Sequence, residues 1–244
     1  MQHQTTIYGI RAVIEAINSG KTIDKVFVQK GLRGPVFNEL EVLIRKHHIS
    51  TSYVPLEKLN RLTKGNHQGI VAQIAPVDFH NLEDVVTHVF ETGVTPLFLI
   101  LDHLSDVRNL GAIIRTAECT GVHAIILPSK GGAPITADTV KTSAGAIFNI
   151  PICKVNHLKD AVYYLQASGV KVVAATEKAS DTIYESDLTV PLALVMGAED
   201  SGVSNAILKT ADQLTRLPMK GTIGSLNVSV ACGAFLYEVL RQRN

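Results

Sequence analysis

Apolar and polar positions alternate in two patterns along the chain, and the longer pattern begins at Leu97. Short apolar runs indicate buried strands, and apolar residues every three to four positions indicate helices. From Leu97 onward this predicts strands over 97–101, 124–127, 171–175 and 192–196, and helices over 110–119 and 158–167. Such alternation is typical of a parallel sheet covered on both faces. A last helix, 228–241, is apolar along its length, which favours packing against that sheet or a partner subunit.

The first part of the chain has a smaller α/β pattern. Apolar residues at helical spacing run from Ile7 to Ile17 and stop at Gly20, a typical residue after a helix. The pattern then predicts strands over 25–28, 51–54 and 69–74 and helices over 36–46 and 56–62. The sequence Ala75-Pro76 ends this pattern. We therefore expect an N-terminal domain over 1–76, a linker over 77–96 containing a helix at 82–90, and a larger domain over 97–244.

Composition places the chain among ordinary globular proteins, with 46% hydrophobic and 18% charged residues. The apolar runs are too short to span a membrane. Residues 1–6 lack the basic and apolar regions of a signal peptide, so we expect a cytoplasmic protein with no membrane association. Cys119, Cys153 and Cys232 are too widely spaced for a disulfide framework or a zinc site. We expect them to be small buried side chains, and we expect no metal.

Charge is divided unequally between the two predicted domains, although the formal net charge is only +1. Residues 1–76 contain ten Lys and Arg against five Asp and Glu, a formal charge of +5, and the remainder carries −4. A basic domain beside an acidic one suggests that the first domain contacts a polyanion. A solvated surface with a chance excess of lysine explains the charge alone equally well.

Several common catalytic motifs are absent. The chain has no Gly-Lys-Ser/Thr phosphate loop, no His-Glu-x-x-His, no Gly-x-Gly-x-x-Gly after a strand and no Gly-x-Ser-x-Gly. These absences disfavour an NTPase, a zinc protease, an ordinary Rossmann enzyme and a serine hydrolase. A small-molecule α/β enzyme would need one of the last two signatures.

Three polar stretches follow predicted strands, at the sheet edge where open α/β proteins bind ligands. The first, 101–118, places Asn109 at the expected N-cap of a helix and puts Arg115 and Glu118 on one helical face. A capped helix with a surface ion pair would give the same pattern.

The other two stretches are rich in glycine. The second, 195–204, leaves a strand through two glycines and is expected to start a helix with acidic residues such as Glu199. The third, 217–229, has exposed amides and places Ser225 and Asn227 ahead of the last helix, an arrangement that can bind an anion or a small polar ligand. Each stretch alone is also compatible with a well-capped turn.

In this order the three stretches closely resemble the motifs of the SpoU/TrmH group of RNA ribose 2′-O-methyltransferases. The motifs are Asn109-x5-Arg115, Met196-Gly197-x-Glu199-x2-Gly202, and Leu217-Pro218-Met219 with Ser225-Leu226-Asn227-x-Ser229. The N-terminal segments Tyr8-Gly9-Ile10-Arg11-Ala12-Val13 and His67-Gln68-Gly69-Ile70 resemble the ribosomal-protein-like RNA-binding domain of two-domain members.

The resemblance implies an α/β fold with two parts: a small RNA-binding domain and a parallel-sheet SPOUT domain threaded into a deep trefoil knot. It also implies a homodimer with its active site at or near the subunit interface, S-adenosylmethionine as methyl donor and RNA as partner. The similarity is greatest to bacterial enzymes that methylate a guanosine of large-subunit (23S) ribosomal RNA. Transfer RNA is the alternative substrate. A non-catalytic RNA-binding ribosome-assembly factor is the alternative from another functional class.

The resemblance also assigns roles to the motif residues. The residues expected around the cofactor are Met196, Gly197, Leu217, Met219 and Leu226. Those expected to be catalytic are Arg115, Asn109, Glu199, Ser225 and Asn227.

Arg115 is expected at the acceptor ribose. Asn109 and Asn227 would orient Arg115 or the ribose, Ser225 would contact substrate or donor, and Glu199 would hold the motif loops or an arginine. A guanidinium group stays protonated at neutral pH, so stabilisation of a developing alkoxide, with an RNA phosphate taking the proton, competes with a role as base.

Overall fold

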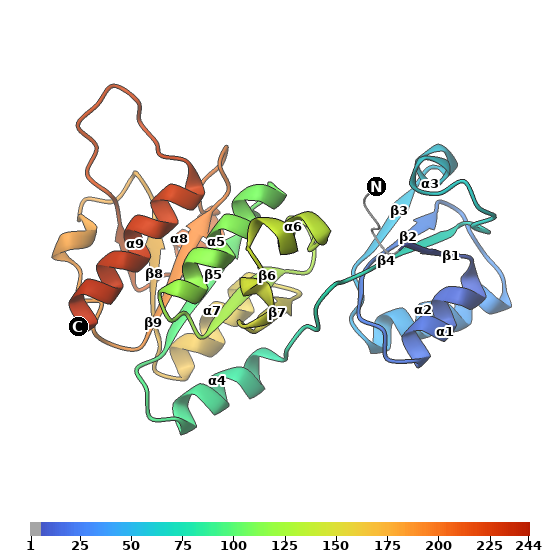
Figure 1. The fold of residues 1–244 in the computed structure, drawn as a ribbon, viewed down its shortest axis with the longest axis horizontal. Coiled ribbons are helices and arrows are strands. Elements are labelled where there is room, and N and C mark those ends of the chain that lie inside the picture. The colour runs from blue at the N-terminus through green and yellow to red at the C-terminus, as the bar shows by residue number, and fades with distance from the viewer. Residues whose placement is uncertain (1–5) are drawn as a thin grey trace. The chain divides into compact units, whose positions relative to one another are not determined.

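The structure, a computed structural model, describes residues 6–244 (Figure 1). The chain divides into an N-terminal unit, Met1–Asp78 with Pro134–Ala137, and a C-terminal unit, Phe79–Ala133 with Asp138–Asn244. The polar segment 1–5, on which the expectation about a signal peptide rested, lies outside the described residues. Within the described part of the chain, no helix combines the length and apolar composition needed to cross a membrane.

The N-terminal unit is built on a four-stranded sheet with the order β1-β4-β2-β3. Its strands are β1 (Thr6–Tyr8), β2 (Ile23–Gln29), β3 (Thr51–Val54) and β4 (Ile70–Ile74). Its helices are α1 (Ile10–Asn18), α2 (Pro35–Lys46) and α3 (Leu56–Leu62). β2 and β3 are parallel, and β4 is antiparallel to both of its neighbours.

Alternate residues of this sheet face two different helical layers. Val26, Val28 and Ala72 pack with the apolar faces of α1 and α2. Phe27 and Val71 point to the opposite face, where they pack with Val54, Leu59 and Leu62 beside or on α3. The period of two in β2 therefore directs α1 and α2 to one side of the sheet and α3 to the other.

One predicted element of this unit is wrong at its start. The helical pattern was extended back to Ile7, but Ile7 lies in β1, opposite Ala72 of β4. Gly9, with φ of +92°, separates the strand from α1. The pairing partner of β1 lies more than sixty residues away, so the local pattern contained no signal for this strand.

The C-terminal unit contains a six-stranded sheet with the order β10-β8-β9-β5-β6-β7. All of its strand pairs are parallel, which confirms the predicted parallel sheet. The strands are β5 (Leu97–Asp102), β6 (Ala124–Pro128), β7 (Ile152–Val155), β8 (Lys171–Ala175), β9 (Leu192–Gly197) and β10 (Gln213–Thr215). The helices are α4 (Leu82–Glu91), α5 (Val107–Cys119), α6 (Ala137–Thr142), α7 (Leu158–Ala167), α8 (Asn205–Leu208) and α9 (Val228–Arg243). Two short 3-10 helices are η1 (Ala146–Phe148) and η2 (Ile183–Glu185).

Helices cover both faces of this sheet (Figure 1). The apolar sides of α4, α7 and α8 form one core with Phe98 and Ile100 of β5 and Val195 of β9. On the other face α5 packs against α9. Leu82, Val86 and Val89 of α4 are buried in the first of these cores, so the helix expected within the linker contributes to the core of the C-terminal unit.

The sequence missed the shortest elements of this unit. β7 and β10 have four and three residues, and α8 has four, too few to show a period. The expectation that all three cysteines are buried is wrong for Cys119, which is exposed at the end of α5. Cys153 and Cys232 are buried as expected, and burial raises the pKa of each thiol to about 12.

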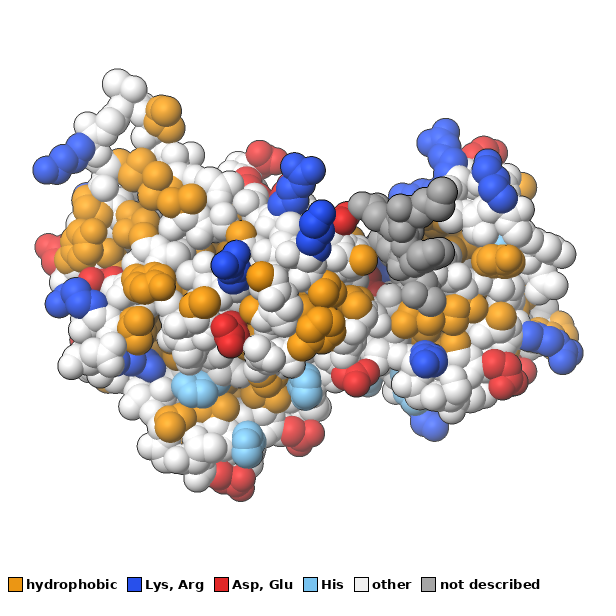
Figure 2. All heavy atoms as spheres, viewed as in Figure 1, with side chains coloured by type: hydrophobic (Ala, Val, Ile, Leu, Met, Phe, Trp, Pro, Cys, Tyr) orange, Lys and Arg blue, Asp and Glu red, His pale blue; other side chains and the backbone are white. Residues whose placement is uncertain are grey.

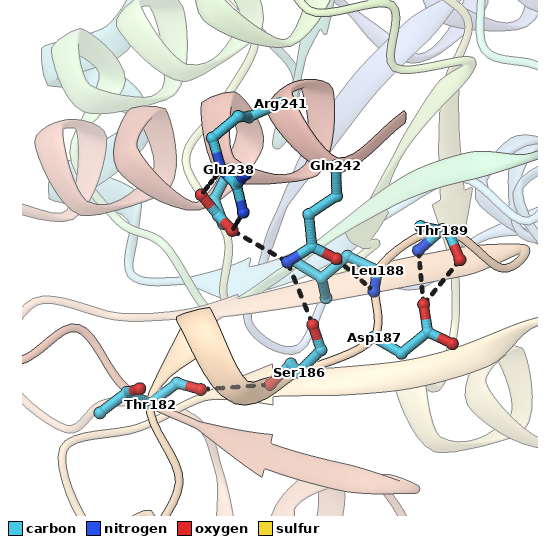
Figure 3. Close-up of polar contacts among 8 residues, drawn as sticks. All are labelled: Thr182, Ser186, Asp187, Leu188, Thr189, Glu238, Arg241 and Gln242. Carbon is cyan, nitrogen blue, oxygen red and sulfur yellow. Dashed lines mark hydrogen bonds and ion pairs between the residues drawn. The ribbon is translucent and has the colours of Figure 1, made fainter. Parts of the chain in front are cut away.

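The end of α9 is anchored to the connection between β8 and β9 (Figure 3). The Gln242 side chain accepts a hydrogen bond from the Leu188 amide at 3.0 Å and donates one to the Ser186 carbonyl at 3.1 Å. Arg241 donates to both carboxylate oxygens of Glu238, at 2.8 and 2.7 Å, and lowers the pKa of Glu238 to about 2. The two Gln242 hydrogen bonds therefore hold the C-terminal end of α9 against this connection.

Candidate active site

The candidate site lies where the strand order reverses. From β5 the chain builds β6 and β7 on one side, then crosses over and places β8, β9 and β10 on the other. The carboxyl ends of β5 and β9 are therefore adjacent, with Asp102 opposite Gly197. Open α/β sheets bind ligands at this reversal because the two loops diverge and leave a crevice.

Asp102, at the end of β5, ties the loops after β5 and β9 together. It is only 1% exposed, and its carboxylate accepts a hydrogen bond from the Ser204 amide at 2.7 Å. The other carboxylate oxygen lies 2.5 Å from Nδ1 of His103. The hydrogen bond from the Ser204 amide holds the two loops together, because breaking it would leave a buried carboxylate oxygen without a partner.

The helix after β5 begins earlier than predicted. Asp106, not Asn109, is the N-cap of α5, and its carboxylate accepts from the amides of Arg108 and Asn109 at 2.7 and 2.8 Å. Asn109 is thus the third residue of the helix, and its side chain is free to act elsewhere. Asp106 was overlooked because the predicted helix began at the apolar residue Leu110.

Asn109 connects all three sequence motifs. Its side-chain amide donates to Oε1 of Glu199 at 2.6 Å, and its carbonyl oxygen accepts from Nδ2 of Asn227 at 3.1 Å. Asn227 is also the N-cap of α9, accepting from the Ser229 amide at 3.0 Å. The structure therefore brings together three predicted catalytic residues, Asn109, Glu199 and Asn227, from segments 90 and 118 residues apart.

Glu199 is not at a helix start, as the sequence had suggested. It lies in a tight turn closed by hydrogen bonds between Ala198 and Gly202, and Ser204 is the N-cap of α8 instead. Gly202 has φ of +67°, a conformation that favours glycine. A Cβ on Gly197 would lie 2.0 Å from the Gly202 carbonyl carbon, so any side chain at this position would force the backbone of the turn to move.

The third motif forms an extended, exposed segment. Among the described residues, the backbone of 217–226 makes no hydrogen bond with another backbone group or a side chain. Its amides and carbonyls are therefore available to a ligand. The structure matches the expectation of exposed amides ahead of α9.

A pocket of about 460 Å³ lies between the turn after β9 and this segment. All five residues predicted to contact the cofactor line it: Met196, Gly197, Leu217, Met219 and Leu226. Glu199 and Ser225 line it as well, whereas Asn109 and Asn227 are joined to it through Glu199. Sequence reasoning missed two further pocket residues, Arg216 and Phe235 of α9, because neither belongs to a recognised motif. The Nε of Arg216 is buried and has no hydrogen-bond partner among residues 6–244.

Arg115 stands apart from this cluster. It is exposed on α5, six residues after Asn109, which corresponds to about 9 Å along a helix. Within residues 6–244 it makes no hydrogen bond or ion pair, and it does not line the pocket. The alternative of an ion pair with Glu118 is wrong, because the Glu118 carboxylate accepts from Asn149 instead, at 3.4 Å. The next residue, Thr116, nevertheless lies against α9, because a Cβ added to Gly233 of α9 would be 3.7 Å from its methyl group.

The described residues contain no cluster of His, Cys, Asp and Glu arranged to hold a metal ion. The polar groups of the site are instead amides, carboxylates and backbone groups around a partly apolar pocket. Such a set can orient a polar organic ligand and hold a hydroxyl group beside it.

Two family matches cover most of the chain. Residues 6–80 match the family described as RNA 2′-O ribose methyltransferase substrate binding, and residues 96–237 match the SpoU rRNA Methylase family.

Relatives of similar length are known in several bacteria. A Bacillus subtilis protein named for the TrmH family of tRNA/rRNA methyltransferases, YacO, is 37% identical over 244 residues, covering 100% of this chain and 98% of that protein. The Vibrio vulnificus 23S rRNA (guanosine-2′-O-)-methyltransferase RlmB is 37% identical, with 97% and 96% coverage. The structure of an AdoMet-bound rRNA methyltransferase from Sinorhizobium meliloti has a TM-score of 0.60 and 28% identity, covering 97% of this chain and 86% of that one.

The pocket at the carboxyl ends of β8, β9 and β10, the three joined motifs and these similarities define the class of the protein as an RNA methyltransferase. The chain belongs to the SpoU rRNA Methylase family, which confirms the resemblance found in its motifs.

Proposed function

We propose that the protein transfers a methyl group from S-adenosylmethionine to the 2′-hydroxyl of an RNA ribose. The observation that carries this proposal is the hydrogen-bonded cluster Asn109, Glu199 and Asn227, which joins three separate motifs beside one pocket. The family match and the AdoMet-bound Sinorhizobium meliloti structure support the same donor and class of substrate.

The pocket residues suit this donor. A volume of about 460 Å³ is within the range of pockets that bury organic ligands of this size. Met196, Leu217 and Leu226 supply apolar contacts, and the backbone of 217–226 supplies unpaired donors and acceptors for the polar groups. When bound, S-adenosylmethionine supplies an electrophilic methyl group on a sulfonium centre.

The protein side chains must orient the ribose hydroxyl and stabilise charge on its oxygen. In the balanced reaction the O–H bond of the hydroxyl and the S–CH₃ bond of the donor would break and an O–CH₃ bond would form. The leaving group would be the neutral thioether S-adenosylhomocysteine, and the proton would pass to an RNA phosphate oxygen or to water. Our candidate for the cation that approaches this oxygen is Arg115, which is exposed and without a partner in the described chain. Asn109 is held in one orientation by Glu199 and Asn227, and Ser225 offers a hydroxyl at the pocket wall.

The substrate we propose is a guanosine of large-subunit ribosomal RNA. The similarity to the Vibrio vulnificus enzyme extends over both units of the chain and therefore includes the segment that matches the substrate-binding family. Transfer RNA is the second candidate, because the Bacillus subtilis relative is named for both RNAs.

A homodimer with a shared active site accounts for the position of Arg115. Val230, Ala234 and Tyr237 form an exposed stripe along α9, and Ile223 in the third motif is 74% exposed. Such a stripe favours contact with a second copy of the chain. That contact would bring residues of the partner to the pocket. It would therefore explain why Arg115 does not line the pocket of its own chain. The trefoil knot implied by the resemblance is part of the same proposal for the segment that carries the second and third motifs.

The test is transfer of labelled methyl from S-adenosylmethionine to unmodified ribosomal RNA and, in parallel, to unmodified transfer RNA. We expect label on ribosomal RNA, loss of transfer in Arg115→Ala, and unchanged binding of S-adenosylmethionine by that variant. Label on transfer RNA alone would overturn the proposed substrate. Full transfer by Arg115→Ala would overturn its role. Binding of RNA without transfer to either RNA would favour the ribosome-assembly factor.

A further inference from the structure

The positive charge of the N-terminal unit is concentrated in two segments. Residues 9–24 and 34–50, which contain α1 and α2, carry four Lys and Arg and four Asp and Glu, and are neutral. Residues 25–33 and 51–76 carry six Lys and Arg against one Glu. The whole +5 of residues 1–76 therefore comes from β2, α3 and the loops that adjoin them.

Those loops meet at one edge of the sheet. The carboxyl ends of β2 and β3 lie at this edge, where the Lys30 amide donates to the Val54 carbonyl at 3.0 Å. β4 begins there, because it is antiparallel to β2 and pairs Ile70 with Val28. The loops 30–34 and 63–69 therefore adjoin, and a Cβ on Gly69 would lie 3.0 Å from the Leu32 side chain.

The six cations lie on this edge and on the α3 side of the sheet. Lys58, Arg61 and Lys64 come from α3 and the loop after it, and Lys30 and Arg33 come from the loop after β2. Lys25 reaches the same side, since its Nζ lies 5.4 Å from the centre of the Phe27 ring and Lys58 Nζ lies 5.9 Å from it. We call the surface formed by these residues the basic surface: Lys25, Lys30, Arg33, Lys58, Arg61 and Lys64. Figure 2 shows Lys and Arg side chains gathered over α3.

No carboxylate among residues 6–244 pairs with any of the six cations. On α2, in contrast, Arg45 forms an ion pair with Glu41 at 3.2 Å. Unpaired surface cations repel one another and so weaken the isolated fold. A polyanion that neutralises them removes this repulsion.

Two further features of the edge suit a phosphate backbone. α1 and α2 both begin there, after Gly9 and Gly34, with neither a side-chain cap nor an acidic residue in the first turn. Their first amides and positive helix ends add to the field of the cations. The ring of Tyr8 packs closely on Gly65, since a Cβ added to Gly65 would lie 2.3 Å from it. Tyr8 is nevertheless 43% exposed, so an unstacked base can reach the exposed part of its ring.

We propose that the basic surface binds the sugar-phosphate backbone of the substrate RNA, with Tyr8 as a stacking platform, and that the opposite face, formed by α1 and α2, does not contact RNA. This inference rests on the proposed RNA substrate and adds the surface that holds it. Single-stranded and looped RNA is bound by this combination of a cationic track and an aromatic ring.

The test compares two triple variants of the full chain that remove the same charge. Lys58→Gln/Arg61→Gln/Lys64→Gln removes three cations from the basic surface, and Lys21→Gln/Arg45→Gln/Lys46→Gln removes three exposed cations from the loop after α1 and the last turn of α2. Binding of an unmodified large-subunit ribosomal RNA transcript is measured as a function of salt. Each phosphate that is no longer neutralised lowers affinity about fivefold at roughly 0.15 M salt, so the first variant should bind about a hundredfold more weakly, with a shallower salt dependence. The second should bind like wild type, because screening over about 8 Å removes distant charge effects.

A second pair tests the aromatic platform. Tyr8→Ala should weaken RNA binding on the order of tenfold, whereas Tyr53→Ala, which removes a 52% exposed tyrosine near Glu41 of α2, should not. Thermal unfolding of both variants distinguishes the loss of base stacking from unfolding of the domain.

The outcomes separate this inference from the proposed function. Equal weakening in the two triple variants, or none in the first, would overturn the basic surface while leaving RNA methylation intact. A wild-type chain that binds S-adenosylmethionine but neither binds nor methylates RNA would overturn the proposed function itself. Retained maximal turnover with a raised KM for RNA in the first triple variant is the expected kinetic signature, because the cations lie outside the candidate active site.

Discussion

Replacement of Gly197 by alanine gives the clearest prediction about the pocket. The added Cβ would lie 2.0 Å from the Gly202 carbonyl carbon, 2.1 Å from the Val203 amide nitrogen and 2.4 Å from the Gly202 carbonyl oxygen. Carbon atoms in contact are normally separated by about 3.5–4.0 Å. The turn must therefore move by roughly 1.5 Å, and the atoms in the way belong to the backbone, which cannot rotate aside as a side chain can.

Overpacking of this kind costs about 1–3 kcal/mol, and we expect the upper end of the range because backbone has to shift. A loss of about 3 kcal/mol corresponds to a fall in Tm of roughly 6–12 °C for a unit of this size. The same movement displaces the pocket wall, so binding of S-adenosylmethionine should weaken by more than about tenfold, equivalent to roughly 1.4 kcal/mol.

Thermal unfolding and calorimetric titration with S-adenosylmethionine measure the two effects on the same protein. Gly224→Ala is the matched control, because Gly224 also lines the pocket but has no atom within 4 Å of an added Cβ and no positive φ. Gly202→Ala should be intermediate, losing about 1–2 kcal/mol from its left-handed conformation without a clash. Wild-type stability and affinity in Gly197→Ala would refute the structural reasoning.

Three other features of the C-terminal unit lead to predictions. Asn109→Ala should reduce methyl transfer while Asp106 still caps α5, so kcat should fall with little change in Tm; a fall in Tm with normal kcat would contradict the assigned orientation role. Because the pKa of Glu238 is about 2 in the folded chain, below its ordinary 4.5, its stabilisation is present at neutral pH and is lost as the pH falls from about 4.5 toward 2. Glu238→Gln should therefore lower Tm at pH 7 and differ progressively less below about pH 4.5, and a difference independent of pH would argue against the ion pair. Cys119 should react with a thiol reagent in the native chain, while the other two cysteines, buried and with pKa values raised to about 12, should react only after unfolding; three reactive thiols in the native protein would contradict the packing of β7 and α9.

Elements with their own period were predictable from the sequence, and elements defined by distant partners were not. The predicted ranges 56–62 and 158–167 coincide with α3 and α7, since both helices show apolar residues at helical spacing. β1 has three residues and exists because β4 pairs with it. β10 is a three-residue edge strand whose partner, β8, comes some forty residues earlier. A local pattern carries no information about either pairing.

The candidate site was likewise only partly predictable from the sequence. The five residues that the motifs single out for the cofactor all line one pocket: Met196, Gly197, Leu217, Met219 and Leu226. Asn109 donates a hydrogen bond to Glu199 and accepts one from Asn227, and both bonds depend on how three distant loops converge at the end of the sheet. Spacing along the chain cannot reveal that convergence. Asp102 was missed because a carboxylate at the end of an apolar strand has no distinctive sequence signal, although it is buried and joins the loops after β5 and β9.

The position of the transferred methyl group tests the central claim most directly. Large-subunit ribosomal RNA without this modification would be incubated with the protein and S-adenosylmethionine, digested to nucleosides and analysed by mass spectrometry. We expect a guanosine that carries one added methyl group on its ribose fragment, at a position whose 3′ linkage resists alkaline cleavage. A methyl group on the base fragment would contradict the chemistry derived from the site.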